Sequence, residues 1–113
     1  MDTMERNRPG MEKIREAAKR IAERFHPERI ILFGSYAAGT DGPDSDADIL
    51  VVMEHGGARR ETALAICGVV SSVGMPKDVF VANRREMETY RDIPGTIASI
   101  ASRTGVVLYD KPA

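Results

Sequence analysis

The chain has 113 residues, which is enough for one domain with one core and too few for a catalytic domain plus a separate substrate domain. Its net charge is −1 and its charges are interspersed, so it lacks the broad basic surface typical of nucleic-acid-binding proteins. A single cysteine excludes an internal disulfide, and neither a signal peptide nor a run of transmembrane length is visible. We therefore expect a cytoplasmic protein that contacts neither membrane nor nucleic acid directly.

Helical and strand-like patterns alternate along the chain. Apolar residues at helical spacing between charged ones predict an amphipathic helix at about 10–25, which Pro27 ends. The further predicted elements are strands at 29–34 and 46–53, a helix at 58–73, a strand at 77–82, helices at 84–90 and 95–103, and a strand at 106–109. Gly105 is the expected C-cap of the last helix. The pattern indicates a single α+β domain over 1–113.

Two details of the helix at 58–73 are also predicted. Leu64, Cys67, Val70 and Ser71 are expected on or near its inner face, with Cys67 a core residue rather than a nucleophile. The pair Arg59-Arg60 at its start, like Arg84-Arg85 later, is typical of a solvated helix start; the alternatives are contacts with a nucleotide or with an acidic partner surface.

The predicted topology brings three aspartates together. The ten-residue connection between Ser35 and Asp46 is short for a parallel crossover, so the first two strands should run antiparallel. The helix between the second and third strands favours a parallel crossover that aligns their starts. Side chains alternate along a strand, so Asp46 and Asp48 share a face and Asp78 should lie beside them. The end of the first strand, Gly34-Ser35, should lie at the same edge of the sheet as these aspartates.

Clustered carboxylates repel one another unless a cation neutralises them, so this arrangement suggests a metal site. Hard oxygen ligands suit Mg²⁺, with Mn²⁺ as the alternative, and two such ions can clamp the attacking and leaving oxygens of a phosphoryl displacement. Zinc is not predicted, because His26 and His55 are far apart and lack partners at ligand spacing. A glycine at 34 allows phosphates to approach the backbone closely.

Gly34-Ser35, then ten residues, then Asp46-x-Asp48 within "SDADILV", resembles the signature of the DNA polymerase β-type nucleotidyltransferases. The size of the chain resembles the minimal nucleotidyltransferases, called MNT. The resemblance implies a small mixed sheet in the order 1-2-3, plus the short C-terminal strand, flanked by helices, with a catalytic core at about 29–110. It also implies that Asp46, Asp48 and Asp78 are catalytic and hold two Mg²⁺ ions, and that Gly34 and Ser35 bind the nucleotide.

One departure from the family concerns the turn after Gly34-Ser35. Many relatives have a basic residue there, whereas this chain has Ala37 and Ala38. Phosphate binding would then depend more on backbone N–H groups, on the Ser35 hydroxyl and on the metal.

The resemblance also implies a partner. MNT proteins are typically encoded beside a HEPN toxin, so the expected activity is transfer of AMP from ATP to a tyrosine hydroxyl of that toxin, with this chain as the antitoxin. Two alternatives stay open: an antitoxin that neutralises its partner by contact alone, and a nucleotidyltransferase that modifies a small molecule. The sequence leaves open whether the active unit is a homo-oligomer or a hetero-oligomer.

Overall fold

The computed structural model describes residues 10–34, 47–74 and 78–112. Each element predicted from the sequence is present, with ends that agree to within a few residues; the predicted starts of two strands, at Asp46 and Lys77, lie outside the described residues. The elements are α2 (Met11–Phe25), β1 (Arg29–Phe33), β2 (Asp48–Val52), α4 (Arg59–Ser71), β3 (Asp78–Ala82), α5 (Arg84–Tyr90), α6 (Ile97–Thr104) and β4 (Val106–Asp110).

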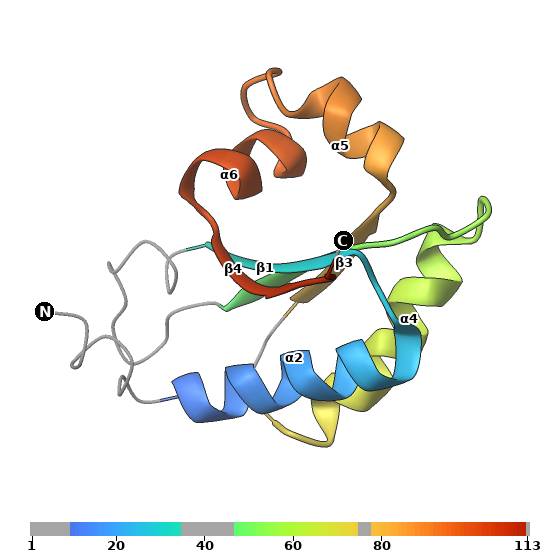
Figure 1. Ribbon diagram of the computed structural model, residues 1–113, viewed down its shortest axis with the longest axis vertical. Helices are drawn as coiled ribbons and strands as arrows, with labels where there is room; N and C mark the ends of the chain where they lie inside the picture. Colours follow the sequence, from blue (N-terminus) through green and yellow to red (C-terminus); the bar gives the residue numbers. More distant parts are fainter. Residues whose placement is uncertain (1–9, 35–46, 75–77, 113) are drawn as a thin grey trace, which may run out of the picture.

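The strands form a mixed sheet in the order β3-β2-β1-β4. β1 and β2 are antiparallel, β2 and β3 are parallel, and β4 pairs antiparallel with β1. This confirms the predicted order and the predicted α+β class. Helices α2 and α4 cover one face of the sheet and α5 and α6 cover the other, so the molecule has three layers (Figure 1).

The face under α2 and α4 holds the larger part of the core. Along α2 the buried residues recur every three or four positions, as the amphipathic pattern predicts, and they are Met11, Ile14, Ala17, Ala18 and Ile21. The last three pack in one cluster with strand residues such as Ile30 and Ile49, which are fully buried, and the first two pack with Leu32 and Ala47. Burial of one such isoleucine side chain stabilises the fold by about 1.5–3 kcal/mol.

The opposite face carries a second apolar layer. Ile31, Leu50 and Val52 alternate with the residues of the first layer and pack against α6 through Ala101 and Ile97. α5 begins at a capping box, in which Asn83 Oδ1 accepts from the Glu86 N–H while a Glu86 carboxylate oxygen accepts from the Asn83 N–H, both at 2.8 Å. These two hydrogen bonds satisfy the N–H groups of Asn83 and Glu86, which have no backbone partner at the start of the helix.

The predicted inner face of α4 is wrong in part. Val70 is buried, but the most buried residue is Ile66, while Leu64 is 60% exposed and Ser71 is exposed. Apolar residues occur on most sides of this helix, so their spacing alone does not define one face. Contact with α2 and β3 decides which side is covered. Cys67 is a half-buried free thiol.

Gly105 is the C-cap of α6, as predicted, and its N–H donates to Ala101 O at 3.0 Å. Its backbone is extended, however, with φ −76°, so left-handed geometry does not explain the glycine. A Cβ at this position would collide with Ala101 O and with Ile31 Cγ2. The glycine is therefore needed because α6 passes close to β1.

Of the helices described, none combines the length and the apolarity that a membrane crossing requires.

Candidate active site

Two of the three predicted aspartates lie side by side. Asp48 begins β2, Asp78 begins β3, and the two residues are directly paired in the parallel ladder. Neighbouring strands are about 4.8 Å apart, and paired residues point to the same face. Asp78 is exposed, whereas Asp48 is half-buried and its Oδ1 is shielded from solvent. The third aspartate, Asp46, lies outside the described residues.

The end of β1 reaches the same end of the sheet, which we call the carboxylate rim after Asp48 and Asp78. Phe33, the last residue of β1, pairs with Asp48 across the antiparallel ladder, and Gly34 follows it with φ 91°. A residue with a Cβ is strained in that conformation, so a glycine suits the exit from the strand. The structure thus brings together Gly34, Asp48 and Asp78, while the predicted nucleotide-binding Ser35 lies outside the described residues.

An aromatic pair lies beside the carboxylates. Strand alternation places Asp48 and Asp78 on the face that also carries Phe33 and Phe80, which is the face covered further along by α5 and α6. The ring centroids of Phe33 and Phe80 are 5.7 Å apart at an interplanar angle of 50°. The rings form an apolar base next to the charged rim.

The donor set is compatible with a hard divalent cation. Within residues 10–34, 47–74 and 78–112, no group of three or more His, Cys, Asp or Glu side chains is arranged to hold a metal ion. Asp48 and Asp78 supply two adjacent carboxylates on their own, and oxygen ligands of this kind suit Mg²⁺, which commonly uses one or two carboxylates together with substrate phosphates.

A second polar cluster, centred on Glu86, was not predicted from the sequence. Glu86 Oε1 accepts from His55 Nε2 at 2.9 Å and from the Asn83 N–H at 2.8 Å, and Arg59 Nη2 lies 3.4 Å from Glu86 Oε2. The Gly57 N–H donates to His55 Nδ1 at 3.1 Å, which assigns the proton to Nε2. Both ring nitrogens of His55 are thus engaged within the fold.

The electrostatics of this cluster favour ionised Glu86. Burial alone would raise its pKa, but the hydrogen bonds from His55 and from the Asn83 backbone, together with the charge of Arg59, lower the pKa below its usual value. The Asn83-x-x-Glu86 spacing is a readable capping-box signal. The contacts to His55 and Arg59 have no local signature, because they join residues far apart in the chain.

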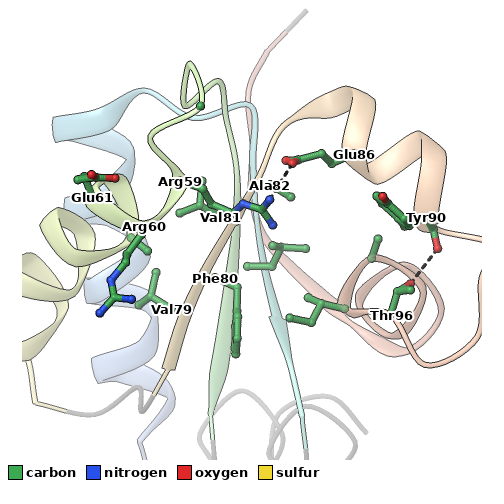
Figure 2. A pocket seen from close by; sticks show the side chains of 15 residues that line it. Arg59, Arg60, Glu61, Val79, Phe80, Val81, Ala82, Glu86, Tyr90 and Thr96 are labelled. Carbon is green, nitrogen blue, oxygen red and sulfur yellow. Dashed lines mark hydrogen bonds and ion pairs between the residues drawn. The ribbon is translucent and has the colours of Figure 1, made fainter.

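A groove of about 690 Å³ runs along β3 (Figure 2). One wall is the start of α4, with Arg59, Arg60 and Glu61, and the other comes from α5 and α6, with Tyr90 and Ile97. In Figure 2 the strand lies between these two walls, with Phe80 on the side of α5 and α6. The groove and the carboxylate rim thus share one strand.

The comparisons with known proteins agree with this geometry. The family described as "Nucleotidyltransferase domain" matches residues 11–104, which is most of the chain. A "putative nucleotidyltransferase from Sulfolobus solfataricus", known from its crystal structure, superposes with a TM-score of 0.57 at 22% identity, covering 88% of this chain and 79% of that one. At that identity the likeness shows the fold alone. No curated protein matches the sequence significantly. The family match, which includes Gly34, Asp48 and Asp78, shows that the chain belongs to the nucleotidyltransferase domain family.

Proposed function

We propose that this chain is a metal-dependent nucleotidyltransferase of the cytoplasm that acts as an antitoxin, transferring AMP from ATP to a tyrosine hydroxyl of a HEPN toxin encoded by the adjacent gene. The observation that carries the proposal is the pairing of Asp48 with Asp78 beside the exit of β1 at Gly34, in a member of the nucleotidyltransferase domain family. The Gly-Ser and Asp-x-Asp spacing resembles that of the DNA polymerase β-type nucleotidyltransferases, and the small size of the chain supports the narrower assignment to the minimal nucleotidyltransferases.

In the proposed reaction the tyrosine oxygen attacks the α-phosphorus of ATP. A bond forms between them, the bond from the α-phosphorus to the bridging oxygen of the β-phosphate breaks, and pyrophosphate leaves. The hydroxyl proton passes to a carboxylate of the rim, for which exposed Asp78 is the candidate. Much of the rate enhancement would come from holding the two reactants in line.

The remaining roles follow from the chemistry of the rim. Asp48 and Asp78, with Asp46 as the third predicted ligand, would hold Mg²⁺, which supplies positive charge opposite the phosphates when it is bound. Gly34 leaves the phosphates free to approach the backbone because it has no side chain. Phe33 and Phe80 would keep water from one side of the carboxylates.

The test is incubation of the purified chain with Mg²⁺, ATP labelled at the α-phosphate and the protein encoded by the adjacent gene. We expect label on a tyrosine of that protein, and we expect Asp48→Asn to reduce the rate at least about 100-fold, since lost charge stabilisation of several kcal/mol has that effect. Asp92→Asn is the matched control, because this carboxylate is 91% exposed and lies on the segment between α5 and α6.

Three results would contradict the proposal in different ways. Neutralisation of the partner by Asp48→Asn, without any label, would indicate an antitoxin that works by contact alone. Label on a small molecule instead of the partner would indicate a nucleotidyltransferase that modifies small molecules. Equal loss of transfer in Asp48→Asn and Asp92→Asn would show that the loss is not specific to the carboxylate rim, and the rim would then have no demonstrated role in the reaction.

A further inference from the structure

The outer edge of β3 lies open to the groove. Among the strands that the structure describes, β3 is the last of the sheet on its side and pairs with β2 only. Ala82 O accepts from the Met53 N–H at 2.9 Å, so the backbone groups of Ala82 face β2. Because these directions alternate along a strand, Val79 and Val81 direct their N–H and C=O groups away from β2, toward the groove.

The two walls of the groove differ in character. Arg59 and Arg60 stand on the α4 side, where Arg59 remains 62% exposed even though it pairs with Glu86. Glu61 also lines this wall, and Glu86, which pairs with Arg59, lines the groove as well, so the two acidic and two basic side chains balance. The positive charge of the wall is therefore local to the exposed Arg60. The α5 and α6 side includes Ile97, which is apolar. Figure 2 shows Phe80 and Tyr90 on this side as well, together with the carboxylate of Glu86.

We propose that this groove binds an extended peptide segment of a partner protein, which adds to β3 as a fifth strand. Main-chain hydrogen bonds to Val79 and Val81 would provide affinity, as in other proteins that bind peptides at a sheet edge. Side chains of an added strand alternate between the two walls. The walls therefore favour an acidic side chain beside Arg60 and apolar ones toward Phe80 and Ile97.

This inference goes beyond nucleotidyl transfer, because it concerns binding alone. It nevertheless has a spatial relation to the rim. β3 begins at Asp78, so a segment paired along this strand runs to or from the carboxylates. A sheet edge left open is a general hazard for aggregation, which proteins avoid by covering it, and a peptide partner would cover it.

The first test uses a fluorescent six-residue peptide of alternating isoleucine and glutamate, with binding followed by fluorescence anisotropy. Two derivatives carry N-methyl groups, one on every isoleucine amide and the other on every glutamate amide. Only one of these two sets of amides faces β3 in a paired strand, so we expect one derivative to lose about tenfold or more in affinity while the other retains it. Slower hydrogen exchange at the Val79 and Val81 amides should accompany binding.

The second test exchanges charge on the wall. Arg60→Glu should weaken the glutamate peptide about three- to tenfold and strengthen a peptide of alternating isoleucine and lysine. The first turn of a helix tolerates glutamate, so the variant should fold. Arg15→Glu is the matched control, because it makes the same change of charge at an exposed position of α2.

The proposal is overturned if the peptide fails to bind, if both N-methylated peptides bind as well as the parent, or if Arg60→Glu and Arg15→Glu have equal effects. It is also overturned if light scattering shows a dimer of this chain in which the Val79 and Val81 amides are already protected, since a second copy would then be the occupant of the edge.

Discussion

Asp48 and Asp78 are partners in register on parallel strands, and their carboxylates project from the same face at the same end of the sheet. Like charges placed directly opposite each other on neighbouring strands destabilise a sheet by up to about 1 kcal/mol. The two carboxylates in this register therefore repel each other, and a cation bound between them would relieve that repulsion.

A thermal melt should reveal the repulsion between these two carboxylates. Without divalent cations, we expect Asp78→Asn to leave the melting temperature unchanged or to raise it slightly, because the change removes one of two like charges at an exposed position. With Mg²⁺ and ATP, the unmodified chain should gain stability that Asp78→Asn does not gain. A marked loss of stability in the variant without cations would show that Asp78 has a structural role instead.

Gly105 permits the close approach of α6 to β1. We expect Gly105→Ala to lower the free energy of unfolding by about 1–3 kcal/mol, since its Cβ would displace Ala101 or Ile31. Gly68→Ala is the control: Gly68 lies within α4 with no atom near its Cβ position, so alanine should stabilise the helix by about 0.5–1 kcal/mol. Urea unfolding measures both, and a neutral Gly105→Ala would mean that the two elements readily separate.

The Glu86 cluster should make stability depend on pH. The pKa of Glu86 is lower in the folded chain than its usual value of 4.5, so its contribution is complete above that value and is lost as the pH falls below it. Glu86→Gln should therefore reduce the stability at pH 7 and flatten its decline in acid. Glu88→Gln, at an exposed position on the same helix, should leave the decline unchanged; unfolding in urea at several pH values distinguishes them.

Two apolar residues of α4 should respond differently to truncation. Ile66 is fully buried, so Ile66→Ala should cost about 2–5 kcal/mol of stability. Leu64 is 60% exposed, and Leu64→Ala should change stability by no more than about 0.5 kcal/mol. If urea unfolding shows equal losses of stability for the two variants, Leu64 belongs to the inner face of α4, as the sequence predicts.

The sequence predicts the strand pairing near the carboxylates well, and the reasons are local. A short connection forces β1 and β2 to be antiparallel, and a helical crossover makes β2 and β3 parallel, so Asp48 and Asp78 meet. The roles predicted for Asp46 and Ser35 stay predictions.

The wrong prediction for α4 and the unpredicted contacts of Glu86 have a different origin. The sequence predicts the wrong side of α4 for Leu64 because that helix has apolar residues on most sides, and only tertiary contacts select one of them. The hydrogen bond from His55 to Glu86 spans 31 positions, so no periodic pattern encodes it. Local rules thus give the elements and their pairing, while contacts between distant segments require the folded chain.

The position of β4 affects how the chain is made. β1 is central in the sheet, and its second neighbour is β4, whose Asp110 lies 81 positions beyond Arg29. During synthesis β1 and β2 emerge from the ribosome early, but the other edge of β1 waits until residues 106–110 have been added. Until then β1 presents an unpaired apolar edge, at which a nascent chain can associate with its neighbours.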